Sequence, residues 1–213
     1  MIRLAATLML VAVLTPGAAL AAAPQPDRAS AAHGPVDWTV GRWMIPAVAN
    51  TRDWDASFAR ATWTGEAIAW SGDWGLGAGG TLFGATTLPG AARDLPANTL
   101  MGDLTARYRL LDGSIQLLAG FRPFSHRHLS YGTVGFTLDR ALPLAGLAVE
   151  AKGLAGANLG RGYVLDGTVG LAYQLGPARL SLGFRQLDMV CGADSAEPLV
   201  TLGGPIVGLS ARL

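Results

Sequence analysis

The sequence predicts an all-β protein, an antiparallel up-and-down β-barrel of ten strands. Three observations predict it. Apolar and polar residues alternate with a period of two from Val36 onward, short and long connections alternate along the chain, and the polar face of the strands consists mainly of small residues. A period of two places successive side chains on opposite faces of a strand. The first two strands have the weakest signal, and without them eight strands would remain.

Two segments precede the predicted barrel. Residues 1–21 have the three parts of a secretory signal peptide: a positive charge at Arg3, an apolar stretch from residue 4 to 14, and a small-x-small cleavage site at residues 19–21. Residues 22–35 are small, polar and proline-containing, which predicts a flexible lead-in. The expected organisation is therefore a signal peptide over 1–21, a lead-in over 22–35 and a barrel over 36–213.

Alternation identifies the strands in order. From Arg179 to Arg185 every second residue is Leu or Phe, and the residues between are Arg, Ser and Gly. Other segments repeat this pattern, including 66–79, where Ile68, Trp70 and Trp74 are expected to share one apolar face. The predicted strands are 36–43, 55–63, 66–79, 100–111, 114–122, 130–139, 144–153, 163–175, 178–188 and 200–213.

The connections between these strands alternate in length. Short turns are expected at Thr64-Gly65, Asp112-Gly113, 140–143 and Gly176-Pro177, and Asp-Gly is a strong hairpin signal. The longer connections are 44–54, 80–99, 123–129, 154–162 and 189–199. Short turns at one end and longer loops at the other are typical of a transmembrane β-barrel.

The composition of the two faces indicates which one is outside. The polar face is dominated by Gly, Ala, Ser and Thr, and small residues relieve crowding inside a narrow barrel. The chain has one lysine, Lys152, and three glutamates, whereas a water-exposed surface usually carries many of both. We therefore expect the apolar face to be outside, against lipid. The formal net charge of +1 gives no basis for nucleic-acid binding.

The C-terminal residues carry a more specific signal. Val207, Leu209, Ala211 and Leu213 alternate to the last residue. This pattern resembles the C-terminal strand of the small, mostly uncharacterised outer-membrane β-barrels of Gram-negative bacteria, although those proteins usually end in Phe. The resemblance implies export to the outer membrane, contact with outer-membrane lipid, recognition of the last strand by the barrel-assembly machinery, and a monomeric state.

Charged residues on the polar face give two interpretations of the barrel interior. A salt-bridged interior would fill the lumen, and we favour it because eight to ten strands enclose little free space. The alternative is a narrow, porin-like pore for small solutes or anions. The charged residues expected on the inner face are Asp73, Asp103, Arg107, Arg109, Arg122, Asp139, Glu150, Lys152, Arg179 and Arg185.

All six tryptophans lie in the first third of the chain, at positions 38, 43, 54, 63, 70 and 74. We expect them to anchor the barrel at the membrane interface, where amphipathic rings are favoured. The alternative is an aromatic surface that binds a sugar or a lipid.

One segment is similar to an enzyme motif. His128-Leu129-Ser130 resembles the His-x-Ser motif of outer-membrane lipid A deacylases, which would make His128 a general base and Ser130 a nucleophile. The family's motif continues with Asn, whereas Tyr131 follows here. His126 and His128 could share a metal, but no carboxylate or cysteine lies beside them in the sequence.

The sequence thus predicts no catalytic residue, no cofactor and no metal site. The single cysteine, Cys191, makes neither an internal disulfide nor a metal motif. The function expected is a structural or interaction role in the outer membrane, with a narrow pore and a lipid A-modifying enzyme using His128 and Ser130 as the alternatives.

Overall fold

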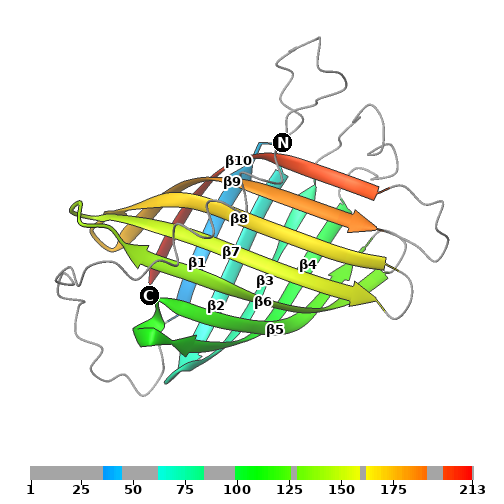
Figure 1. The fold of residues 1–213 in the computed structure, drawn as a ribbon, viewed down its shortest axis with the longest axis horizontal. Helices are drawn as coiled ribbons and strands as arrows, with labels where there is room; N and C mark the ends of the chain where they lie inside the picture. Colours follow the sequence, from blue (N-terminus) through cyan, green and yellow to red (C-terminus); the bar gives the residue numbers. More distant parts are fainter. Residues whose placement is uncertain are drawn as a thin grey trace, which may run out of the picture.

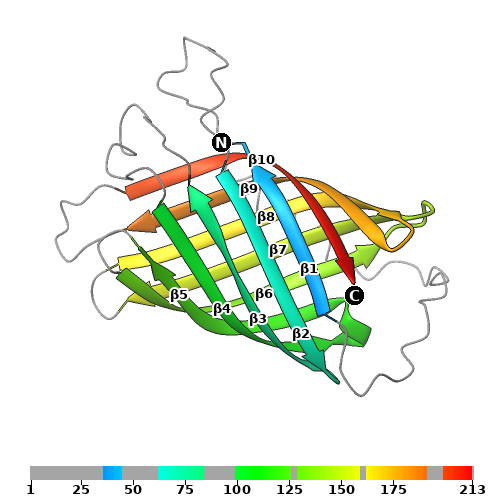
Figure 2. The same cartoon turned by 180° about the vertical axis from the view of Figure 1, so that it is seen from behind.

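The chain folds into one closed barrel of ten antiparallel strands (Figures 1 and 2). The computed structural model describes residues 36–44, 62–83, 99–125, 129–158, 162–190 and 199–212, and it confirms the ten-strand up-and-down barrel. The strands are β1 (Val36–Trp43), β2 (Thr62–Ser71), β3 (Trp74–Phe83), β4 (Thr99–Leu110), β5 (Ile115–Phe124), β6 (Leu129–Ala141), β7 (Leu147–Asn158), β8 (Gly162–Leu175), β9 (Ala178–Val190) and β10 (Leu199–Arg212). No helix in these ranges is long and apolar enough to cross a membrane.

Several predicted features lie outside the described residues. They include the signal peptide over 1–21, the lead-in over 22–35, and the individual residues Trp54, His126, His128 and Cys191.

The two ends of the barrel differ. At one end, here called the turn end, short connections join β2 to β3, β4 to β5, β6 to β7 and β8 to β9. The first residue of β1 and the last residue of β10 lie at the same end. The other end, the loop end, holds the remaining connections. Turns at Asp112-Gly113 and Gly176-Pro177 are confirmed, with φ of 84° at Gly113 and 58° at Gly176.

The strands are strongly staggered. Asp37 on β1 pairs directly with Arg212 on β10. A row of paired residues also leaves Asp37 in the other direction and passes through β2 to β9. This row reaches β10 at Val200, twelve residues from Arg212. Such a stagger requires strands that tilt relative to the barrel axis. Residues that meet inside the barrel therefore come from different heights of their own strands.

The predicted boundary between the second and third strands is wrong. The Thr64-Gly65 turn lies inside β2, where Gly65 pairs with Val40 on one side and Gly80 on the other. The turn is at Gly72-Asp73 instead, where Gly72 has a φ of 59° that a tight hairpin requires. A two-residue hairpin pairs residue 71 with residue 74, so even-numbered residues change face between β2 and β3.

Two expected connections at the loop end are shorter than predicted. The 123–129 and 154–162 connections contract because β5, β6, β7 and β8 extend into them. The strand pairing there includes Pro123 with Ser130 and Asn158 with Gly162.

The apolar face of the sheet is outside, as predicted. Leu76, Val134 and Leu182 are 72%, 64% and 62% exposed, whereas Arg122 and Arg185 are buried inside the barrel at 1% and 6%. This is the reverse of a barrel built for water, in which large apolar side chains fill the interior.

Glycine on the inner wall makes room for large side chains. Gly75 on β3 faces the Trp70 ring, and a Cβ at Gly75 would lie 2.7 Å from that ring. Gly77 has the same role, because its Cβ would lie 2.6 Å from the Thr105 hydroxyl oxygen. The glycines of β3 therefore leave space in the lumen, and side chains from β2 and β4 occupy it.

We predict that Gly75→Ala lowers the free energy of unfolding by about 1–3 kcal/mol, because the added methyl group overpacks the wall against Trp70. The measurement is the denaturant midpoint of the refolded barrel. Gly167→Ala is the control, because a Cβ at Gly167 would meet nothing within 4 Å. Equal midpoints for the two variants would contradict the packing argument.

Candidate functional site: the filled lumen

The loop end of the lumen is closed by apolar side chains. Every strand except β2 and β7 contributes to this apolar layer, whose buried members are at most 4% exposed. Trp43 packs edge-on against Phe83 with ring centroids 6.4 Å apart, and its indole nitrogen donates to the Gly204 carbonyl at 3.2 Å. The buried members are Trp43, Phe83, Met101, Phe124, Tyr131, Val164, Leu187, Met189 and Leu202.

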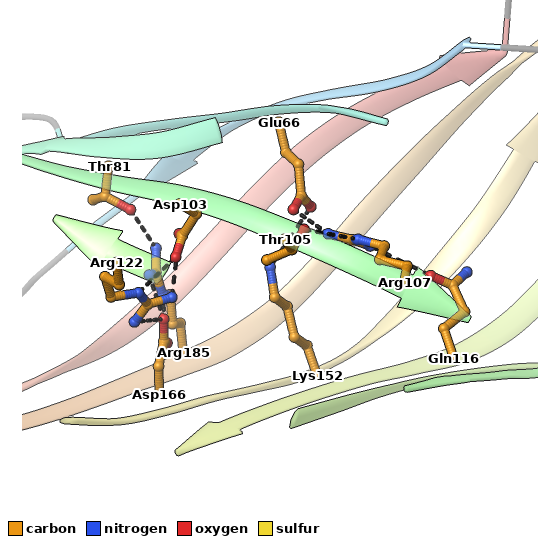
Figure 3. Close-up of polar contacts among 10 residues, drawn as sticks. All are labelled: Glu66, Thr81, Asp103, Thr105, Arg107, Gln116, Arg122, Lys152, Asp166 and Arg185. Carbon is orange, nitrogen blue, oxygen red and sulfur yellow. Dashed lines mark hydrogen bonds and ion pairs between the residues drawn. The ribbon is translucent and has the colours of Figure 1, made fainter. Parts of the chain in front are cut away.

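A layer of ion pairs lies next to the apolar layer, on the side of the turn end, because its members are two residues away from apolar-layer residues on the same strands. Figure 3 shows its contacts. Asp166 is at its centre, 2.7 Å from Arg185 and 2.9 Å from Arg122. Arg122 also contacts Asp103 at 2.6 Å. We call Thr81, Asp103, Arg122, Asp166 and Arg185 the upper ion layer.

The upper ion layer spans the lumen. Arg122 on β5 reaches Asp166 on β8, and Arg185 on β9 donates to the Thr81 hydroxyl on β3 at 3.0 Å. The Arg185 guanidinium also lies over the Trp43 ring, 4.7 Å from its centroid. This cation–π contact joins the ion layer to the apolar layer.

A second set of polar contacts lies closer to the turn end (Figure 3). Glu66 on β2 pairs with Arg107 on β4 and, at 3.6 Å, with Lys152 on β7. Arg107 also donates to the Gln116 side chain at 3.3 Å. In a closed order of ten strands β2 and β7 are diametrically opposite, so the Glu66–Lys152 pair crosses the full width of the lumen. We call this set the lower ion layer.

At the turn end, one cluster joins the first strand to the last. Asp37 on β1 is 2.7 Å from Arg212 on β10 and 3.5 Å from Arg109 on β4. Its carboxylate also accepts a hydrogen bond from the Trp70 indole at 2.7 Å, and Arg109 stacks on that ring, 3.4 Å from the centroid. The cluster therefore supports the seam at which the barrel closes.

A more open cluster lies on another part of the turn end. Asp139 and Glu150 are directly opposite each other on β6 and β7, an arrangement that places like charges together. Arg179 on β9 bridges them at 2.5 Å and 2.9 Å. The Asp139 side chain is 44% exposed, against 7% for Asp166, so water reaches this end of the lumen more than the upper ion layer.

The charges of the inner wall are paired. All arginines that face the lumen in the described strands have a carboxylate within ion-pair distance. Paired buried charges hold each other in fixed positions, because separating them leaves a charge without compensation in a poorly solvated place. The geometry is that of a filled interior with fixed side chains.

Most of the predicted inner charges lie where expected. Nine of the ten face the lumen, and the exception is Asp73, which lies in the β2–β3 turn because the hairpin is displaced from its predicted position. The prediction missed Asp37, Glu66, Asp166 and Arg212. The sequence pattern does identify Asp166 as inward-facing, because it lies two residues before Thr168 in β8 and therefore on the same, predicted polar face.

The expectation that all tryptophans anchor the barrel at an interface is wrong for two of them. Trp43 and Trp70 point into the lumen and are 0% and 3% exposed. Trp70 changes face because the turn lies after it, at Gly72-Asp73. Trp63 and Trp74 face outward, at 51% and 63% exposed.

The His-x-Ser hypothesis stays a prediction. Ser130 takes an outward-facing position near the start of β6, whereas its neighbour Tyr131 is buried in the apolar layer. His128, the proposed base, lies outside the described residues. Within the part of the chain that the structure describes, no group of three or more His, Cys, Asp or Glu side chains is arranged to hold a metal ion.

Comparison with known proteins does not assign the chain to a family. The sequence matches no protein-family model and no curated protein sequence.

We predict that the upper ion layer contributes more to stability than the Arg179 cluster. Arg122→Leu should lower the free energy of unfolding by about 3–5 kcal/mol, because it leaves buried carboxylates uncompensated. Arg179→Leu should cost about 1 kcal/mol or less, because its partners are partly exposed.

The dependence on salt concentration distinguishes the destabilisation caused by Arg122→Leu from that caused by Arg179→Leu. Unfolding of each variant and of the parent protein is compared at low and at high ionic strength. The cost of Arg179→Leu should shrink in high salt and that of Arg122→Leu should persist, because buried pairs are screened less. An equal loss of unfolding free energy and an equal salt dependence in the two variants would contradict the distinction between a buried upper ion layer and a more exposed Arg179 cluster.

Proposed function

We propose that this protein is an integral barrel of the bacterial outer membrane with a closed lumen and a structural or interaction role. The observation that carries the proposal is the pairing of an apolar outer wall with an ion-paired interior. A soluble barrel would expose the charges and bury the leucines. The C-terminal alternation through Val207 and Leu209, both outward-facing, further supports export to that membrane.

The outer wall has the charge distribution that lipid requires. Among the outward-facing positions of the described strands, three residues are charged: Arg42, Arg140 and Asp188. Each lies within the last three residues of its strand. A charge at the middle of the bilayer costs about 2–4 kcal/mol, whereas the cost near an interface is small. Arg140 and Asp188 therefore lie toward the two ends of the wall, whereas the pairing of Arg42 with Val207, and of Val207 with Leu182, places Arg42 nearer its middle. Apart from Arg42, the wall between the two ends is suited to a hydrocarbon core.

Amphipathic aromatic residues on the outer wall mark both ends. At the turn end Trp74 and Tyr108 pack together with ring centroids 4.9 Å apart. Tyr163 lies at the loop end, at the second position of β8. Two aromatic girdles at the two interfaces are characteristic of outer-membrane barrels.

The lumen supports a closed barrel rather than the alternative of a narrow pore. A solute would have to pass the apolar layer and two layers of ion pairs that join opposite walls. The apolar layer and the upper ion layer are built from buried side chains, so opening the upper ion layer would leave buried charges without their partners.

Insertion into a membrane can be tested with a charge on the outer wall. Leu182→Arg places a cation in the middle of β9, and we expect it to lower the free energy of folding into lipid vesicles by about 2–4 kcal/mol. Gln186→Arg is the matched control, on the same strand and face but nearer the loop end. The parent protein should fractionate with the outer membrane and migrate differently on a gel before and after boiling. Recovery as a soluble protein would reject the proposal.

Closure of the lumen is tested separately, by conductance across planar lipid bilayers. The purified, folded protein should give no stepwise ionic current, because the apolar layer and the upper ion layer block the path. Gel mobility before and after boiling confirms that the inserted protein is folded. Reproducible single-channel steps from the parent protein would establish the pore instead.

A further inference from the structure

Water reaches the part of the lumen that lies between the upper ion layer and the turn end. Successive inward residues of β7 show the change along the lumen. The Glu150 and Lys152 side chains are 35% and 30% exposed, whereas Leu154, the next inward residue toward the loop end, is 5% exposed. On β6 the inward Thr133 is 5% exposed, and Thr137, nearer the turn end, is half-buried. Water therefore enters from the turn end and reaches as far as Lys152.

One side of this water-accessible region is lined by small residues with hydroxyl groups. Four neighbouring strands, β8, β9, β10 and β1, each place one half-buried hydroxyl residue here, with a glycine at an adjacent inward position. These hydroxyl residues are Thr168, Ser181, Ser210 and Thr39. The other side carries larger inward side chains, such as Arg107 on β4 and Leu118 on β5, which are buried at 3% and 4%. The small-residue side therefore leaves room for a solute and supplies groups that donate and accept hydrogen bonds.

Lys152 presents a positive charge to this region. Its side chain extends from β7 toward Glu66 on β2 (Figure 3), and the two charged groups are 3.6 Å apart, which is longer than a normal hydrogen bond. In the sheet Lys152 lies between Thr137 on β6 and Thr168 on β8. An ammonium group has three N–H donors, and where water reaches it, another oxygen acceptor can replace that water. Lys152 is therefore able to bind an anion that enters from the turn end.

We propose that Lys152 and the hydroxyl residues of β8 to β1 form a binding site for a small, hydroxylated carboxylate that enters the lumen from the turn end. The ligand's carboxylate makes a charge-assisted hydrogen bond with the Lys152 ammonium, and its hydroxyl groups exchange hydrogen bonds with Thr168 and the two serines. Glu66 stays compensated by Arg107 when Lys152 turns to the ligand. The buried upper ion layer stops the ligand from going further, so the site has one entrance. The inference concerns the lumen alone and does not depend on the proposed membrane location.

The test uses D-gluconate as the probe and isothermal titration calorimetry of the folded full chain in non-ionic detergent. Lys152→Met should weaken gluconate binding by at least about tenfold, because a hydrogen bond to a charged group contributes about that factor. Thr168→Leu should also weaken binding, because the larger side chain occupies the space beside Lys152. Gly167→Leu is the matched control and should bind gluconate like the parent, because this adjacent residue faces outward and a Cβ there meets nothing within 4 Å. Gel mobility before and after boiling checks that each variant is folded.

Chemical labelling gives a second measurement on the unaltered protein. Lys152 is the only lysine of the chain, so its acetylation by a small water-soluble reagent, followed by mass spectrometry of the peptide that contains it, reports on this site. Gluconate should slow the acetylation in a saturable manner, and sorbitol, which has a similar hydroxylated chain without the carboxylate, should not. Three results would each overturn the inference: a Lys152 that resists acetylation in the folded protein, equal effects of gluconate and sorbitol, or unchanged gluconate binding in Lys152→Met. An equal loss of binding in Thr168→Leu and Gly167→Leu would also reject the site inside the lumen.

Discussion

The interior depends on the ion pairs that Asp166 makes with Arg122 and Arg185. These three side chains come from β8, β5 and β9 and lie at most 8% exposed. Moving such charges out of water costs several kcal/mol for each ion, which only close pairing compensates. Once paired, Arg185 supports Trp43 of the apolar layer and Arg122 holds Asp103. The wall, the ion layers and the apolar layer are thus parts of one packed interior.

The faces of most strands could be predicted from the sequence because the signal is local. Leu180, Leu182 and Phe184 alternate with Arg179 and Arg185 within seven residues, and a strand fixes which side each takes. The partners across the lumen could not be predicted. Glu66 and Lys152 meet because the closed strand order places β2 opposite β7, and the stagger sets the height at which they meet. Register of this kind is a property of the whole sheet.

The apolar layer was missed for a different reason. On β9 the inward face changes from polar to apolar along the strand, since Arg179 and Arg185 are followed by Leu187 and Met189. Alternation separates two faces, and it carries no information on how one face changes from end to end. The turn error in β2 added to this, because Gly65 and Gly72 are equally plausible turn residues in the sequence and only strand pairing distinguishes them.

The change of chemistry along the lumen makes the barrel directional. Polar groups at the turn end, such as Asp139 and Glu150, contact water, whereas the loop end is sealed by aromatic and aliphatic side chains. A water molecule or ion that enters from the turn end meets paired charges and then an apolar wall, on which it can make no hydrogen bonds.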